Sequence, residues 1–435
     1  MSNNLLSRSI KWIIFAVLGL IVFHAPLTVY LGSRLPDFAL VIKAWKEILI
    51  IVGLIILAVE MIRRRAWKML TGDWLIRLIA VYAVIHIASL SIWNGTDAAI
   101  AGLMIDLRYL AFFALVYGFV KLEPQNLDKI VRLVILGAIL VVGFGLLQVF
   151  LPKDFLVLLG YGKETIMPYT TVDQNHDFVR LQSTLRGPNP FGAYVAAAGA
   201  LLAAFIVKSR KRMKWHWSVI TGLVILLTCY LSYARSAYVA LAVGLAIVLV
   251  VSLQNKLRHK DWFLLVSAAL VCIIILFSFK TNPYVSTVFW HEDPSEGGLV
   301  NSNDGHASSL VDGMKRLATQ PFGDGVGSTG SASLLGDQPV IIENQYLMIA
   351  HEAGWAGLVV FLSIFVIVLK RLWSLRSSWP GLGLFASGVG LAIIGILLPV
   401  WVDDTVSIIW WGFSAAVIGG NYGQKIAIKK TARTT

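Results

Sequence analysis

Cysteine is almost absent from this sequence. Only Cys229 and Cys272 occur among the 435 residues, and each lies inside a long apolar segment. Two cysteines placed in this way exclude a disulfide framework, and they lack the close spacing of a cysteine metal site. We therefore interpret both as thiols that pack within apolar segments of the fold.

Acidic residues are also few. The chain has 24 Asp and Glu against 37 Lys and Arg, and its formal net charge is +13. A basic excess often indicates nucleic-acid binding. Here 57% of the residues are hydrophobic, and the basic residues cluster between long apolar segments. This arrangement is typical of a membrane protein, so we expect membrane lipids and no nucleic acid as partners.

Apolar segments long enough to cross a bilayer recur along the whole chain. A spanning helix needs about 20 residues, and a backbone in lipid must satisfy its own hydrogen bonds, so these segments should be helical. The sequence predicts an all-α polytopic membrane protein with about twelve transmembrane helices. The predicted spans are residues 12–31, 45–62, 74–92, 103–120, 130–150, 191–207, 216–232, 236–253, 262–279, 341–369, 381–401 and 405–421.

Basic residues mark alternate connections between these spans. The positive-inside rule assigns that side to the cytoplasm and places both termini inside. The clusters lie at residues 8–11, 63–68, 121–132, 208–214, 256–260, 370–376 and 425–433.

Two hydrophilic segments on the opposite, outer side divide the chain. The predicted parts are transmembrane helices one to five (1–150), a first outer loop (151–190), helices six to nine (191–279), a large outer loop with short helices (280–340), and helices ten to twelve with a cytoplasmic tail (341–435). Within the large loop, Leu310, Met314 and Leu317 recur at helical spacing. They predict an amphipathic helix at about 307–319, ended by Pro321. That helix either covers a cavity or only packs the loop against the membrane face.

Four arginines lie at the outer boundary, against the topological bias, namely Arg180, Arg186, Arg235 and Arg316. Because guanidinium groups bind phosphate oxygens in a bidentate way, a diphosphate ligand would account for them. The alternative is that each pairs with a nearby acid or extends to lipid headgroups.

Two other features of the outer side have open interpretations. The glycine-rich run at residues 325–330 is either a flexible turn or a backbone site for an anionic group. Asp403 and Asp404, in the last outer turn, are expected to be exposed to solvent, with orientation of an acceptor as the alternative.

Four segments together resemble, in this order, the O-antigen ligase and polymerase superfamily. Residues 180–192 are similar to its R-x-x-G-T-x-x-x-x-N-x-x-[GA] block, and residues 232–236 to its S-x-S-R-[GS] turn. Residues 306–327 resemble its amphipathic helix followed by P-x-x-G-x-G. Residues 343–357 resemble its [HDE]-N-x-Y-L block with the following E-x-G-x-x-G. The resemblance covers residues 175–360, and the first five spans match in hydropathy alone.

The resemblance implies a GT-C-like membrane glycosyltransferase of the bacterial inner membrane with its active site on the extracytoplasmic side. Such an enzyme moves a glycan from an undecaprenyl diphosphate carrier to a hydroxyl of a glycan or glycolipid acceptor, by inversion and without a metal or cofactor. Where many ligases carry His and many members carry Arg, this chain has Glu343 and His306. Either residue is a candidate general base, and Arg180, Arg186, Arg235 and Arg316 are candidates for binding the diphosphate.

Two other classes remain as alternatives. Twelve spans with both termini inside also suit a transporter or a flippase for lipid-linked glycans of the envelope, although transporters usually repeat their halves and place polar residues near the membrane midplane. The third alternative is a non-catalytic assembly protein of the envelope. Convergence of the arginines and Glu343 beneath the 280–340 loop would favour the enzyme.

Overall fold

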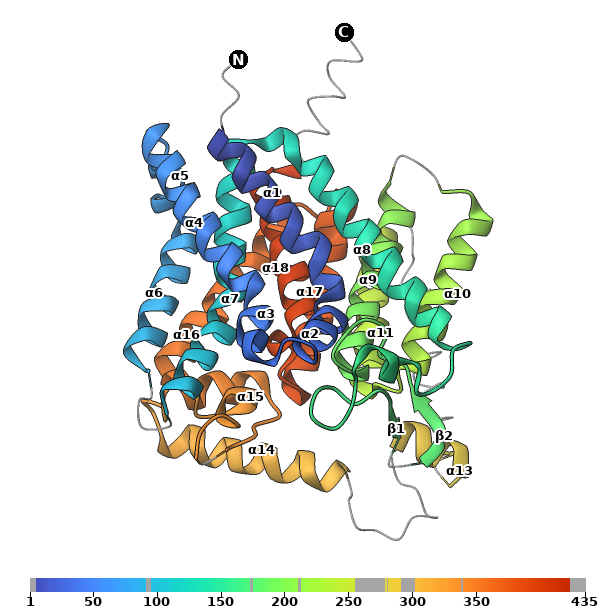
Figure 1. Cartoon of the computed structure of the whole chain (residues 1–435). Coiled ribbons are helices and arrows are strands. Elements are labelled where there is room, and N and C mark those ends of the chain that lie inside the picture. The colour runs from blue at the N-terminus through green and yellow to red at the C-terminus, as the bar shows by residue number, and fades with distance from the viewer. Residues whose placement is uncertain are drawn as a thin grey trace.

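The computed structural model describes residues 5–90, 95–172, 175–209, 213–254, 278–279, 281–290, 302–337 and 339–422. These residues form a helical bundle with one small sheet (Figure 1). The helices are α1 (Leu5–Leu20), α2 (His24–Gly32), α3 (Ala39–Lys43), α4 (Trp45–Arg63), α5 (Lys68–Thr71), α6 (Trp74–Ala88), α7 (Thr96–Leu122), α8 (Leu127–Gln148), α9 (Pro188–Lys208), α10 (Trp215–Leu231), α11 (Arg235–Leu253), α13 (Pro283–Val285), α14 (Ser302–Thr319), α15 (Gly330–Ser333), α16 (Gln345–Ser374), α17 (Trp379–Leu397) and α18 (Asp404–Gly419).

Helices lie at every predicted span except 262–279, most of which falls outside the described residues. Among the described helices, seven are long and apolar enough to cross a membrane. The helices α6, α10 and α18 are apolar but shorter, and α4 carries Lys46, Glu47 and Glu60 within its 19 residues. The structure is therefore that of a polytopic, mostly helical membrane protein, and the total of twelve spans remains a prediction.

The bundle is held together by long helix pairs. Helix α7 packs along α18, α1 along α4, and α16 along α6, while α9, α11 and α17 pack on one another. Small residues let these last three backbones approach closely, as is common between membrane helices. Ala200, Ala204 and Ala386 are fully buried where they meet.

One group of ionic contacts lies at the upper end of the bundle in Figure 1. The buried carboxylate of Glu60 accepts hydrogen bonds from Arg63 Nε at 2.9 Å and Ser7 Oγ at 3.1 Å. Arg64 Nη2 lies 2.7 Å from Glu123 Oε1. Several basic clusters that the sequence assigns to the cytoplasm therefore share one end, and we call it the basic end.

The opposite end carries the irregular elements. Helix α14 lies across it, next to α15, and the antiparallel pair β1 (Thr170–Val172) and β2 (Asn175–Arg180) projects from it near α13 (Figure 1). The sequence did not predict this hairpin, in which Thr170 pairs with Arg180. The predicted amphipathic helix is present as α14, which begins earlier than expected and ends before Pro321. We call this end the motif end.

Candidate functional site

The first two motif segments form one unit at the motif end. Arg180 donates from Nε to the carbonyl of Ser232 at 3.0 Å and from Nη2 to Asn189 Oδ1 at 2.6 Å and to the Tyr233 carbonyl at 3.3 Å. A Cβ on Gly192 would stand 2.8 Å from that of Ala234, so only glycine allows α9 to approach the turn this closely. The guanidinium of Arg180 thus fastens the start of α9 to the turn that precedes Arg235.

The third and fourth segments form a second unit. Glu352 is buried in α16, and its Oε1 accepts backbone hydrogen bonds from Gly327 at 3.1 Å and Thr329 at 3.4 Å. The backbone of the glycine-rich run therefore binds the carboxyl group of the protein's own Glu352, and a site there for an external anion stays a prediction.

A bend in α16 completes this second unit. Gly354 has a positive φ of 66° inside the helix, and its neighbour Trp355 donates from its backbone to the Pro321 carbonyl at 2.9 Å. A side chain at Gly354 would be strained at this φ and would also crowd the Pro321 carbonyl. The bend thus holds the end of α14 against α16.

The turn between α17 and α18 joins the two units. Gln345 Oε1 accepts from the backbone of Trp401 at 2.8 Å, and Asn344 Nδ2 donates to the Ile396 carbonyl at 2.7 Å. From the other unit, Arg186 Nη1 lies 3.8 Å from Asp404 Oδ2. Segments that are distant in sequence therefore meet around this turn, which includes the 3₁₀ helix η7 (Val400–Val402).

A cavity of about 250 Å³, which we call the outer cavity, lies beside this turn. Arg186 lines it, and the Arg186 side chain is 47% exposed, so a ligand in the cavity can reach the guanidinium. The lining also includes Asp403. Burial, followed by the charge of neighbouring Asp404, raises the pKa of the Asp403 carboxyl. The remaining lining residues are Asn189, Pro190, Ala193, Ser331, Ile394, Leu398, Pro399, Val400 and Val402.

A second cavity of about 370 Å³, the α14 cavity, lies between α14 and the segment that leads into α16. Glu343 and Arg316 both line it, together with Ser309 and Asp312. The backbone of Glu343 donates to Ser309 Oγ at 3.0 Å, which fixes the segment to the helix. Helix α14 therefore does form one wall of a cavity, while Leu317 packs it down on a small cluster with Ile342 and Leu347.

A buried ionic network lies behind the outer cavity. Asp404 Oδ1 lies 2.6 Å from Arg108 Nη1 and 3.1 Å from Lys46 Nζ, and its Oδ2 lies 3.4 Å from His24 Nε2. Glu47 Oε1 lies 3.1 Å from Lys46 Nζ. The expectation that Asp403 and Asp404 face solvent is wrong, because they are 8% and 3% exposed. Cations from α4 and α7 offset the cost of burying Asp404.

Three of the predicted site residues are divided between two cavities. Arg186 lines the outer cavity, and Glu343 and Arg316 line the α14 cavity. Arg235 donates from Nη1 to the carbonyl of Trp290 at 3.1 Å. His306 lies in α14, one turn before Ser309, and its side chain is outside the description.

The sequence analysis did not predict the buried ionic network around Asp404. His24, Lys46, Glu47 and Arg108 lie in the first five spans, where the family resemblance is limited to hydropathy. A signal was present, since ionisable residues inside apolar spans usually serve a site or pair with one another. Within the described ranges, no group of three or more His, Cys, Asp or Glu is placed to hold a metal.

Comparison with known proteins gives one informative relative. The chain is 23% identical over 261 residues to a protein named O-antigen polymerase from Salmonella muenchen. The match covers 58% of this chain and 63% of that protein, so it spans less than two thirds of the relative's length. No family model matches the sequence. The similarity confirms that this chain resembles the O-antigen ligase and polymerase superfamily, as its four motif segments predict.

Proposed function

We propose that this protein transfers a glycan from an undecaprenyl diphosphate carrier to a hydroxyl group of an acceptor at the outer face of the cytoplasmic membrane. The observation that carries the proposal is that the first and fourth motif segments meet at the α17–α18 turn, beside cavities lined by Arg186, Arg316 and Glu343. The O-antigen polymerase relative supports the same class of reaction.

The leaving diphosphate needs positive charge that is present before the reaction. Arg186 presents an accessible guanidinium in the outer cavity, and its contact with Asp404 restricts its position. An arginine held in this way can donate two hydrogen bonds to phosphate oxygens as negative charge develops on them. We assign diphosphate binding first to Arg186, with Arg235 and Arg316 as further candidates. Arg180 is better placed to fix the loop than to bind the ligand.

Glu343 is the proposed general base. It would take the proton of the acceptor hydroxyl while that oxygen attacks the anomeric carbon, and the bond from this carbon to the diphosphate oxygen breaks. Inversion follows because attack and departure occur on opposite faces. His306 is the alternative base, since it lies one helical turn before Ser309, which binds the Glu343 backbone. The proposed step uses no metal, because the arginines supply the positive charge.

The relative favours a polymerase, in which the acceptor is a second carrier-linked glycan, over a ligase. The alternative of a transporter or flippase is less well supported. Lys46 and Asp404 are within the first two residues of α4 and α18, at the motif end. Transporters usually bind substrate near the membrane midplane, whereas this network lies beside the outer cavity.

Reconstitution tests this proposal. Purified protein in liposomes receives an undecaprenyl diphosphate-linked glycan, alone or with a glycolipid acceptor. A polymerase should give a ladder of carrier-linked products from the donor alone, and a ligase should give capped product when the acceptor is added. If neither product forms but the labelled donor crosses the bilayer, the flippase alternative is favoured.

A further inference from the structure

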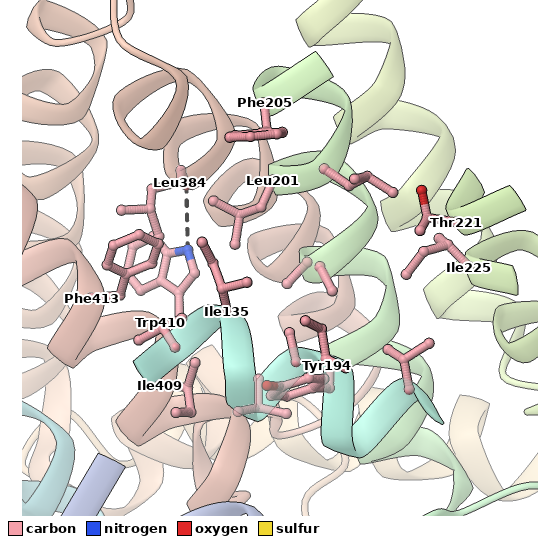
Figure 2. Close-up of a pocket in the computed structure, with 18 of the residues that line it drawn as sticks. Ile135, Tyr194, Leu201, Phe205, Thr221, Ile225, Leu384, Ile409, Trp410 and Phe413 are labelled. Carbon is pink, nitrogen blue, oxygen red and sulfur yellow. Dashed lines mark hydrogen bonds between the residues drawn. The ribbon is translucent and has the colours of Figure 1, made fainter. Parts of the chain in front are cut away.

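Two buried features of the bundle lie apart from the residues assigned above. The first is a cavity of about 420 Å³ between α8, α9, α10, α17 and α18, lined almost entirely by apolar side chains such as Leu201 and Phe205 (Figure 2). Many apolar molecules suit such a lining, so it does not select one ligand. The second feature is a group of ionisable side chains from α6, α7 and α16. Ionisable residues within membrane helices usually serve a site or pair with one another.

Two carboxyl groups meet in this second feature. Glu352 of α16 and Asp106 of α7 are 1% and 4% exposed, and their side chains are in hydrogen-bonding contact. Glu352 Oε1 accepts from the backbones of Gly327 and Thr329. Glu352 Oε2 and Asp106 Oδ2 are buried and have no donor among the described residues. Because ionised carboxylates can only accept, a hydrogen bond between the two groups requires a proton on one of them.

Neighbouring cations do not take the place of that proton. In the part of the chain that the structure describes, no Lys or Arg pairs with Asp106 or Glu352, and Arg108, on the same helix as Asp106, contacts Asp404 at 2.6 Å instead. The glycine-rich run contributes backbone donors alone. The other titratable side chains around the two carboxyl groups come from α6 and α7, and they are Tyr82, His86 and Tyr109.

His86 can provide a donor only if it takes up a proton itself. Its Nδ1 lies 2.9 Å from the Tyr82 carbonyl, and because a carbonyl only accepts, Nδ1 carries a hydrogen. In the neutral ring, Nε2 is then an acceptor, and it lies 3.7 Å from Asp106 Oδ2 without a partner among the described residues. The contact between the two carboxyl groups is therefore the first place for a bound proton, and His86 is the competing place.

The carboxyl of Glu352 also holds the segment that contributes to both cavities of the motif end. Thr329, whose backbone donates to Glu352, donates from Oγ1 to the Val340 carbonyl at 2.9 Å. Val340 lines the α14 cavity, and Ser331, two residues after Thr329, lines the outer cavity. A displacement of the Glu352 side chain would therefore reach the lining of each cavity.

We propose that Glu352 and Asp106 share one proton, and that this proton makes Glu352 a positioning residue for the glycine-rich run. With the proton present, one side of the Glu352 carboxyl binds Asp106 while Oε1 accepts from Gly327 and Thr329. Without it, two like charges would face each other in a buried site, and the run would lose its anchor. The shared proton is independent of the proposed function, whereas its effect on glycan transfer rests on that function.

Infrared difference spectra of the purified protein test the shared proton. At neutral pH the wild type should show the carbonyl band of a protonated carboxylic acid. Glu352→Gln should lose this band, and Asp106→Asn should shift or lose it. Glu164→Gln, which changes an exposed carboxylate of the first outer loop, should retain it. A spectrum without such a band, or with a band that both buried variants leave unchanged, would overturn the proposal.

The pH dependence of unfolding in detergent gives a second measurement. Free carboxyl groups have lost their protons above about pH 5, so in that range the folded wild type holds one proton more than the unfolded chain. The stabilisation is therefore lost as the pH rises, and the unfolding constant should increase about tenfold per pH unit relative to that of Glu352→Gln. The glutamine amide donates to Asp106 without a bound proton. Parallel pH profiles of the two proteins would contradict the shared proton.

Glycan transfer in liposomes tests the positioning role. Glu352→Met, of similar size, can neither accept from the glycine-rich run nor bind Asp106, and it should lower kcat roughly 10²-fold, as a displacement of about 1 Å can do. Glu352→Gln should recover most of that loss, and equal rates of the two variants would overturn the positioning role. If the infrared band and the pH dependence appear but the wild type transfers no glycan, the shared proton stands and the proposed function fails. If transfer occurs without them, the function stands and this proposal fails.

Discussion

Arg186 and Asp404 lie 3.8 Å apart, and they connect the loop before α9 with the first residue of α18. Asp404 also contacts Arg108 and Lys46 in the buried network. The Arg186 guanidinium in the outer cavity is therefore connected through Asp404 to Lys46 of α4 and Arg108 of α7. We therefore expect the positioning of Arg186 and the stability of the bundle to depend on the same carboxylate.

Replacing Asp404 with Asn should destabilise the protein strongly. The amide cannot balance Lys46 and Arg108, and removing one partner of a buried ion pair costs roughly 3–5 kcal/mol. Denaturant unfolding in detergent would measure this loss. The control is Asp312→Asn, which breaks an exposed pair with Lys315 and should cost less than about 1 kcal/mol. Equal effects of the two changes would show that the network does not support the fold.

Removing the guanidinium of Arg186 should impair transfer. Loss of a charge-assisted hydrogen bond costs roughly 1.5–3 kcal/mol, so Arg186→Ala should lower kcat/KM about 10- to 150-fold in the liposome assay. Arg186→Lys should remain impaired, because an ammonium group cannot present two parallel donors. Arg235→Ala, tested beside it, shows whether the second arginine shares this role. Full activity of all three variants would show that neither Arg186 nor Arg235 contributes to diphosphate binding.

Asp73 should make stability depend on pH in the acid range. Partial burial opposes ionisation of this carboxyl, but hydrogen bonds from Arg371 and Tyr117 outweigh that effect and lower its pKa from 3.8 to about 2. Because the folded pKa is lowered, the stabilisation is present above pH 3.8 and is lost as the pH falls toward 2. Allowing for solvent screening, it amounts to about 1 kcal/mol.

Melting temperatures of wild type and Asp73→Asn, measured from pH 6 to about pH 2, would isolate this contribution. The gap between the two proteins should narrow as the pH falls through the window below about pH 4. A gap that stays constant over this range would contradict the assigned pKa.

The orientation of the bundle rests on the placement of basic residues, and labelling would test it. In a background without Cys229 and Cys272, Asp312→Cys on α14 should react with a membrane-impermeant maleimide in spheroplasts. Ser377→Cys, exposed in the turn between α16 and α17 at the basic end, should react only after lysis. The reverse pattern would place the motif end in the cytoplasm and exclude the proposed reaction at the outer face.

Much of the fold follows from the sequence, because a bilayer imposes helices on any apolar segment of sufficient length. The periodicity of Leu310, Met314 and Leu317 likewise predicted α14 and its end. The β1–β2 hairpin was not predicted, since its residues show no clear alternation of polar and apolar side chains. Its position depends on Arg180, which binds residues that are distant in the sequence.

The candidate site was only partly predictable for a related reason. Motif spacing made Arg186 and Glu343 candidates, because the resemblance covers their segments, and their roles stay predictions. The burial of Asp404 depends on Lys46 and Arg108, which come from helices outside that resemblance. No local pattern around Asp404 distinguishes a solvated turn from a helix start packed against two cations.

The most direct test of the account is a single-turnover transfer reaction in liposomes with an undecaprenyl diphosphate-linked glycan, comparing wild type with Glu343→Gln. Removal of a general base typically lowers the rate about 10²–10⁴-fold, so Glu343→Gln should bind the carrier and transfer its glycan very slowly. Glu164→Gln, the same change at an exposed loop position on that face, should behave as wild type. Product formation by Glu343→Gln at the wild-type rate would contradict the assigned base, and absence of product from the wild type would contradict the proposed function.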